Sequence, residues 1–274
     1  VNTDNQVAIA RAGGIPPLIC LLTSGNSRTQ AQATAALWRL AVNTDNKVAI
    51  ASAGGIPPLI SLLTSGNSVT QALAAGALSK LAVNTDNEVA IARAGGIPPL
   101  ISLLTSGNSG TQYYAAGALW RLAGNTDNKV AIASAGGIPP LISLLTSDDS
   151  ETQTLAVAAL TGLAAENTDN KVAIASAGGI PPLISLLTSD NSETQTLAAC
   201  ALRNLAVNTD NKVAIASAGG IPPLISLLTS DDSETQEQAA GALANLAVNT
   251  DNQVAIARAG GIPPLISLLT SGNS

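Results

Sequence analysis

The fold is decided by a stretch of 41 residues that runs from Asn43 to Val83 and reads NTDNKVAIASAGGIPPLISLLTSGNSVTQALAAGALSKLAV. Its opening tetrapeptide, Asn-Thr-Asp-Asn, begins at positions 2, 43, 84, 125, 167, 208 and 249. The spacing is 41 residues at every step but one, where Glu166 adds a single residue. A fixed period of this length indicates a repeat architecture, here with six complete repeats and a partial seventh.

Each repeat contains the start and stop signals of three helices. In the first repeat, a helix that includes residues 7–10 stops at the glycine pair 13–14, where glycine accepts a left-handed backbone. A second helix, over residues 15–22, begins with Ile-Pro-Pro, and proline suits the first helical turn. A third begins with a predicted capping box that pairs Ser27 with Gln30.

The third helix carries an apolar stripe that a single repeat cannot bury. In the first repeat the stripe comprises Ala33, Ala36, Leu37, Leu40 and Ala41, at helical spacing. Stacked repeats can bury it in a continuous core, which predicts an all-α solenoid. Strands are excluded by length and periodicity. No apolar run reaches the roughly 20 residues of a membrane helix, because Gly-Gly and Pro-Pro interrupt the longest ones.

These repeats resemble the armadillo family. The shared pattern is Asn-x-x-Asn-Lys-Val-Ala-Ile-Ala, then Ala-Gly-Gly-Ile-Pro-Pro-Leu-Ile, Leu-Leu and Thr-Gln-x-x-Ala-x-x-Ala-Leu-x-x-Leu-Ala, and it is most similar to vacuolar armadillo scaffolds and plant U-box ubiquitin ligases. The resemblance implies a right-handed superhelix whose third helices line a concave groove that binds extended peptides. We expect one domain over 1–274, with repeats 2–42, 43–83, 84–124, 125–166, 167–207, 208–248 and a partial repeat 249–274.

The repeats are nearly identical to one another, which has two explanations. Either the array duplicated recently, or it was built by consensus or recombination design. The sequence contains no Met, so we expect a trimmed or engineered fragment. It opens with Val1, the type of residue that ends a repeat, and stops at Ser274 before a seventh third helix. We therefore expect either a piece of a longer solenoid or copies that stack end to end. The alternative to a binding protein is a designed or self-assembling structural array that has no specific ligand.

Differences between repeats concentrate on the third helix. All four aromatic residues of the chain lie there, in the first and third repeats, namely Trp38, Tyr113, Tyr114 and Trp120. Aromatic side chains supply much of the binding energy at protein interfaces. We predict that Trp38, Tyr114 and Trp120 face a ligand; the alternative is that they fill gaps between neighbouring repeats.

A row of basic residues occupies one position of the third helix in three successive repeats, at Arg39, Lys80 and Arg121. Such a row would attract an acidic peptide, and the neighbouring Trp rings could add cation–π contacts. The alternatives are a solvated face that keeps the array soluble, and a nucleic-acid contact. The chain argues against a uniformly basic nucleic-acid binder, because its net charge of −6 is the sum of +3 over residues 1–124 and −9 over residues 125–274.

The resemblance also bears on the mode of binding. Peptide-binding armadillo proteins carry an Asn on the third helix that bonds the ligand backbone, and a Trp four residues before it. Here only Asn204 and Asn245 keep that Asn, and the Trp is absent from every repeat. The binding of a basic nuclear-localisation signal is therefore not expected. The candidate peptide-binding residues are Trp38, Arg39, Lys80, Tyr114, Trp120, Arg121, Arg203, Asn204 and Asn245.

The sequence contains no catalytic constellation. There is no His to serve as a base or a metal ligand, and nothing would activate Cys20 or Cys200. The Asp-x-Ser-Glu clusters at 148–151, 190–193 and 231–234 are predicted helix caps; a calcium site is the alternative, without an EF-hand pattern. We therefore expect no enzyme and no cofactor. Two unpaired Cys and no visible signal peptide favour an intracellular compartment.

Overall fold

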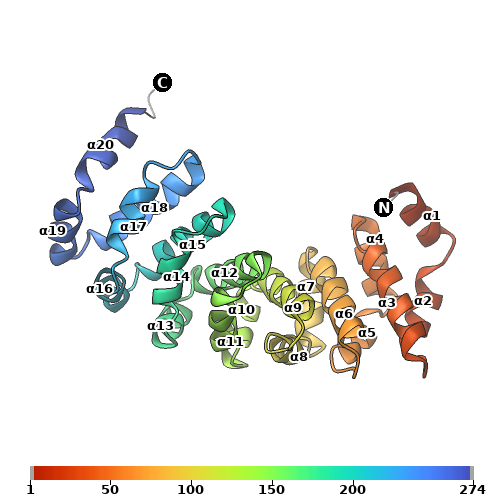
Figure 1. Cartoon of the computed structure of the whole chain (residues 1–274). Helices are drawn as coiled ribbons and strands as arrows, with labels where there is room; N and C mark the ends of the chain where they lie inside the picture. The colour runs from red at the N-terminus through yellow and green to blue at the C-terminus, as the bar shows by residue number, and fades with distance from the viewer. Residues whose placement is uncertain (1–2, 272–274) are drawn as a thin grey trace. The chain divides into compact units, whose positions relative to one another are not determined.

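The structure, a computed structural model, describes residues 3–271, and the regular secondary structure in that range is all helical. These residues form twenty α-helices and one short 3₁₀ helix, with no strand among them. The chain divides into two compact units, one reaching Pro140 and the other beginning at Leu141 (Figure 1). The predicted pattern of three helices per repeat is confirmed in both units.

Three classes of helix recur along the chain. The first helices of the repeats, nine residues each, are α1 (Thr3–Arg11), α4 (Thr44–Ser52), α7 (Thr85–Arg93), α10 (Thr126–Ser134), α13 (Thr168–Ser176), α16 (Thr209–Ser217) and α19 (Thr250–Arg258). The short second helices are α2 (Ile15–Leu21), α5 (Ile56–Leu62), α8 (Ile97–Leu103), α11 (Ile138–Ser143), α14 (Ile180–Leu186), α17 (Ile221–Leu227) and α20 (Ile262–Ser271). The long third helices are α3 (Ser27–Leu40), α6 (Ser68–Leu81), α9 (Ser109–Leu122), α12 (Ser150–Ala164), α15 (Ser192–Leu205) and α18 (Ser233–Leu246).

The helix ends follow from a few residue types. Gly13, at the end of the first helix of its repeat, has a φ of 77°, a backbone that glycine adopts without strain. Pro16 and Pro17 lie in the first turn of α2, where a missing N–H leaves no bond unmade. The inserted Glu166 also has a positive φ, of 56°, and it follows a third helix that is one residue longer than the others.

The predicted capping box of the third helix is wrong in its details. Asn67, one residue before Ser68, is the N-cap of α6, and its Oδ1 accepts the N–H of Val69 and of Thr70. Gln71 does not pair with Ser68; its Nε2 donates 2.7 Å to the carbonyl of Ser65 in the preceding loop. An Asn or Asp with extended backbone before the Ser therefore does the capping that we expected of the Ser.

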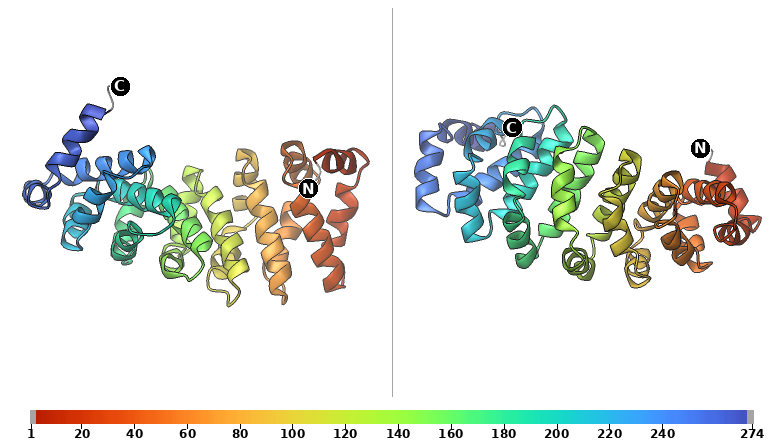
Figure 2. Two further views of the ribbon diagram at one scale, coloured as in Figure 1. Left: turned by 45° about the horizontal axis from the view of Figure 1, so that its top comes forward. Right: turned by 60° about the horizontal axis from the view of Figure 1, so that its bottom comes forward.

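Within each unit, third helices pack most extensively against third helices. In unit 1, α6 lies between α3 and α9, and in unit 2, α15 lies between α12 and α18. The left view of Figure 2 shows the unit 1 helices side by side, in orange to yellow. Ala74, Ala75 and Ala115 at these contacts are completely buried. Small side chains allow the helix axes to approach closely, so the repeats within each unit share an aliphatic core.

In both units, a buried Asn on a first helix ties its repeat to the one before it. Asn87 in α7 donates through Nδ2 to the carbonyl of Lys47 on α4, at 3.3 Å, and to that of Leu81 at the end of α6, at 3.1 Å. Asn211 in unit 2 makes the same two bonds, 3.1 Å to Lys171 and 3.2 Å to Leu205. The carbonyls of Leu81 and Leu205 also accept the backbone N–H of Asn84 and of Asn208, so the Asn side chain adds a second donor there and links the repeats.

No single helix within residues 3–271 is long and apolar enough to cross a membrane. One bent pair, α10 with the stretch Ile138–Thr146, is long and apolar enough for a membrane span only when its two parts are counted together. Ile132 and Leu141 of this pair are completely buried, as expected for helices of a repeat core.

Candidate functional site

Two aromatic rings meet above the middle helix of unit 1. Trp38 on α3 and Tyr114 on α9 lie 5.9 Å apart between ring centroids, edge to face at 75°. The helix between them, α6, presents Gly76 at this point, and a Cβ there would lie 3.1 Å from Nε1 of Trp38 and from Cδ1 of Tyr114. The glycine therefore leaves the space through which rings from the first and third repeats make contact.

This arrangement bears on the predicted role of the aromatics. Trp38 and Tyr114 are half-buried, and Tyr113 packs edge-on against Tyr114 at 5.0 Å. The indole Nε1 of Trp38 is buried and has no acceptor among the described residues, so the ring is held by packing alone. The contact between Trp38 and Tyr114 is thus of the kind that the alternative interpretation expects, in which aromatic rings pack between repeats. Their remaining exposed edges lie on the surface of α3 and α9.

Trp120 and Arg121 form a separate contact near the end of α9. The guanidinium carbon of Arg121 lies 3.9 Å from the centroid of the Trp120 ring, a cation–π geometry. Trp120 is half-buried and Arg121 is exposed. The ring therefore holds a cation at the surface of α9.

The basic row of unit 1 is exposed. Arg39, Lys80 and Arg121 lie in the last turns of α3, α6 and α9, the end of a helix that favours positive charge. All three side chains are exposed, and none forms an ion pair with a described residue. Their positive charge is consequently available to a ligand.

The predicted site residues of unit 2 are engaged with neighbouring repeats. Arg203 donates from Nη1 to Oε1 of Gln238 at 3.0 Å, and the same nitrogen lies 3.9 Å from Glu237. Asn245 donates to the carbonyl of Arg203 at 3.0 Å, and Asn204 donates to that of Thr161 at 3.5 Å. Each amide therefore donates an N–H that links two neighbouring third helices.

Gly241 leaves space for a side chain of the neighbouring repeat in unit 2, as Gly76 does in unit 1. A Cβ on Gly241 would lie 2.8 Å from Nε of Arg203, so the arginine side chain crosses the next helix at that glycine. We did not single out Gly76 or Gly241 as functional from the sequence. The signal that could have identified them is a glycine on the third helix directly beside a large side chain of the adjacent repeat.

Acidic residues at the start of the third helices act as caps, as predicted. Asp232 is the N-cap of α18 and accepts the N–H of Glu234 and of Thr235, together with the hydroxyls of Thr235 and Thr196. These bonds favour the ionised carboxylate and lower the pKa of Asp232. The residues around it line a pocket of about 370 Å³, namely Ser192, Glu193, Thr196, Leu197, Asp232 and Glu234.

Other titratable groups do not form a chemical site. Cys200 is half-buried, and burial raises the pKa of its thiol, which keeps it protonated. Burial also raises the pKa of Glu88 on α7. Over residues 3–271, no three His, Cys, Asp or Glu side chains gather closely enough to hold a metal ion.

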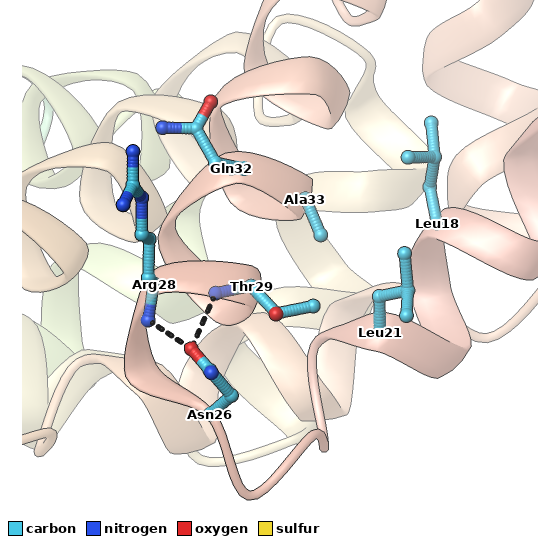
Figure 3. A pocket seen from close by; sticks show the side chains of 7 residues that line it. All are labelled: Leu18, Leu21, Asn26, Arg28, Thr29, Gln32 and Ala33. Atoms are coloured by element: carbon cyan, nitrogen blue, oxygen red, sulfur yellow. Dashed lines mark hydrogen bonds between the residues drawn. The ribbon is translucent and has the colours of Figure 1, made fainter.

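A pocket of about 380 Å³ opens between α2 and α3 at one face of unit 1 (Figure 3). Its lining consists of Leu18, Leu21, Asn26, Arg28, Thr29, Gln32 and Ala33. Leu21 is 42 % exposed there, whereas Leu62, at the same position of the second repeat, is 5 % exposed. The pocket is therefore the surface that a preceding repeat covers at later positions of the array.

The repeats of three helices agree with what comparisons to known proteins find. The sequence model of the Armadillo/beta-catenin-like repeat matches residues 2–42, 43–83, 84–124, 125–165, 167–207 and 208–248. The chain belongs to the armadillo repeat family. Its fold class, an all-α armadillo solenoid, is the predicted one. A comparison with curated proteins finds no match.

Similar solved structures are engineered armadillo arrays. An engineered protein is 43 % identical, with a TM-score of 0.94 over 99 % of this chain and 67 % of its own. Computationally designed armadillo repeat proteins for modular peptide recognition are 27 % identical, with a TM-score of 0.80 over 84 % and 99 %. A designed armadillo repeat protein in complex with the peptide (KR)4 is 26 % identical, with a TM-score of 0.78 over 85 % and 99 %. An armadillo repeat scaffold with a consensus-like sequence is the description that these findings support.

Proposed function

We propose that this armadillo scaffold is a non-enzymatic, single-domain binding protein, and that α3, α6 and α9 of unit 1 hold an extended acidic peptide. The observation that carries the proposal is the row of three exposed, unpaired cations at Arg39, Lys80 and Arg121. One cation per repeat on successive third helices matches a ligand that carries negative charges at intervals along its length.

The aromatic residues support the same surface. Trp120 holds Arg121 above its ring, which reduces the rotamer freedom that an acidic ligand would have to remove. The exposed edges of Trp38 and Tyr114 lie on the helices that carry the cations, and they offer apolar contact between the charged positions. The related designed protein in complex with (KR)4 supports peptide binding by this fold. The exposed cations of unit 1 favour the opposite charge here.

The test uses a fluorescein-labelled octaglutamate peptide and fluorescence anisotropy at two salt concentrations. Replacing Arg39, Lys80 and Arg121 together by Gln is expected to weaken binding about eight- to 125-fold, the product of three single losses, since an exposed ion pair contributes up to about 1 kcal/mol. Each single variant is expected to weaken binding about two- to fivefold. The binding of octaglutamate by the unaltered protein is expected to weaken as salt rises.

The matched control is Arg93→Gln, which removes an exposed arginine of the same unit from a first helix, α7. It is expected to leave octaglutamate binding within a factor of two. Equal losses in the control and the triple variant would reject the proposed surface. Tighter binding of labelled oligo(dA) than of octaglutamate would instead favour a nucleic acid, and tighter binding of (KR)4 would reject an acidic ligand.

A further inference from the structure

One position of the first helix carries a different kind of side chain in the third repeat. The residue directly after the Asn-Thr-Asp-Asn tetrapeptide is Lys or Gln in the other repeats and Glu only at position 88. Lys and Gln side chains contain N–H donors, whereas a carboxylate contains only acceptors. The third repeat therefore has an acceptor where the other repeats have a donor. The residues at this position are Gln6, Lys47, Glu88, Lys129, Lys171, Lys212 and Gln253.

The contacts of the two Gln residues show what a donor does at this position. Gln6 donates from Nε2 to the carbonyl of Arg39 at 2.8 Å, and Gln253 donates from Nε2 to that of Ala247 at 2.8 Å. Both carbonyls lie at the end of a third helix, where carbonyl groups outnumber N–H groups and the helix dipole is negative. A donor at this position therefore stabilises the carbonyl-rich end of a third helix.

Glu88 brings a second acceptor to such a helix end instead of a donor. It lies on α7, which contacts α9, and a Cβ on Gly124 would lie 3.3 Å from Oε1 of Glu88 and 3.2 Å from the carbonyl oxygen of Arg121. The carboxylate of Glu88 is half-buried and forms no hydrogen bond or ion pair with a described residue. Burial raises the pKa of this carboxyl, because the charged form loses water without gaining a partner.

Gly124 leaves the carboxylate of Glu88 uncovered. The equivalent residue of four other repeats, two positions after the third helix, is an exposed Val. These residues are Val42, Val83, Val207 and Val248. A side chain at position 124 would begin within 3.3 Å of Oε1 of Glu88 and would cover it. The third repeat thus departs from the others twice at one place, with an acceptor in place of a donor and with no side chain above it.

We infer that Glu88 and the carbonyl of Arg121 bind one cationic side chain, a Lys or Arg of the peptide ligand. The inference rests on the proposed function and refines it: the peptide is acidic opposite the basic row and carries one basic residue opposite Glu88. That residue supplies the N–H donors that Lys or Gln supplies in the other repeats, and its charge suits the end of α9. The guanidinium of Arg121 does not take this place, because it lies over the Trp120 ring and forms no ion pair with Glu88.

The experiment uses octapeptides in which Lys replaces one Glu of octaglutamate, at each position in turn, as competitors of fluorescein-labelled octaglutamate. At least one interior Lys peptide is expected to bind the unaltered protein about two- to fivefold tighter than octaglutamate, the effect of one exposed ion pair, although it carries less negative charge. Glu88→Lys and Glu88→Gln should each make octaglutamate the tightest ligand. Both variants introduce a residue type that other repeats carry at this position, so the circular-dichroism spectrum should stay unchanged.

The matched control is Asp86→Lys, which makes the same change of charge at an exposed residue in the same turn of α7. It is expected to leave the preference for the Lys peptide within a factor of two. Gly124→Val keeps the carboxylate of Glu88 but covers it, and should remove most of the preference.

Three results would overturn the inference while octaglutamate still binds. They are tighter binding of octaglutamate than of every Lys peptide by the unaltered protein, a preference that survives Glu88→Gln or Gly124→Val, and a preference that Asp86→Lys removes as completely as Glu88→Lys does. The absence of octaglutamate binding by the unaltered protein is a different failure, because it would reject the proposed function and the inference together.

Discussion

At the scale of the residue, the buried Asn that the first helices carry from α4 onward is the clearest stabilising device of the array. Replacing Asn87 by Leu removes two hydrogen bonds, one to the carbonyl of Lys47 and one to the carbonyl of Leu81, although Leu81 still accepts the N–H of Asn84. A hydrogen bond contributes about 0.5–1.5 kcal/mol net, so the loss of two is expected to lower the free energy of unfolding by about 1–3 kcal/mol. Urea unfolding followed by tryptophan fluorescence measures it, because both Trp residues lie in unit 1.

The first repeat supplies the control for this prediction. Asn5 has the same place in its repeat as Asn87, but it is exposed and forms no hydrogen bond with its side chain among the described residues. Asn5→Leu should therefore change the unfolding free energy by less than about 0.5 kcal/mol. An equal loss of stability in both variants would mean that the effect arises within a single repeat and not between repeats.

Residue roles that depend on one repeat were predictable, and those that depend on two were not. The left-handed Gly13 follows from local backbone preferences, and the structure confirms it. The bonds of Asn87 and the space above Gly76 exist only because a neighbouring repeat lies alongside. Comparing single positions between repeats could not show that Trp38 and Tyr114 meet across an intervening helix.

At the scale of the element, the start of α18 gives a pH dependence. The pKa of Asp232 is lowered in the folded state by its hydrogen bonds, so the ionised carboxylate stabilises the folded chain. This stabilisation is complete above the ordinary Asp pKa of about 3.9 and is lost as pH falls through the lower, folded-state value. Asp232→Asn keeps an N-cap acceptor without the charge, as Asn191 does on α15.

We therefore expect thermal unfolding of Asp232→Asn to depend less on pH below about 4 than that of the unaltered protein. Asp231→Asn is the comparison, because Asp231 is exposed and bonds to no described residue. Its pH profile should follow that of the unaltered protein. Superimposable profiles for all three proteins would show that the cap does not contribute to acid sensitivity.

Element boundaries were predictable where Gly and Pro set them and less so where side chains compete to cap. The second helices begin at Ile-Pro-Pro, as the sequence indicates. The third helices are capped by the Asn or Asp before the Ser, since an Asn such as Asn67 takes the extended backbone of an N-cap and its Oδ1 reaches two N–H groups. Capping by the Ser and capping by the Asn or Asp before it both fit the local sequence, and only the backbone conformation of the loop distinguishes them.

At the scale of the whole molecule, tryptophan fluorescence and circular dichroism follow different parts of the chain during unfolding. All four aromatic residues lie between positions 38 and 120, within unit 1, whereas helices extend through both units. In a repeat array each repeat is stabilised mainly by its neighbours, so distant repeats need not unfold together. A single transition is therefore not required, and two spectroscopic probes can follow different repeats.

A substitution in unit 2 tests this separation. Asn211→Leu removes the donors to the carbonyls of Lys171 and Leu205, far along the chain from either Trp. We expect it to lower the urea midpoint of part of the circular-dichroism transition while the tryptophan-fluorescence midpoint stays within error. Asn87→Leu should do the reverse and shift the fluorescence midpoint. Equal shifts of both probes in both variants would require the chain to unfold as one cooperative block, because local loss of stability would then be felt by every repeat.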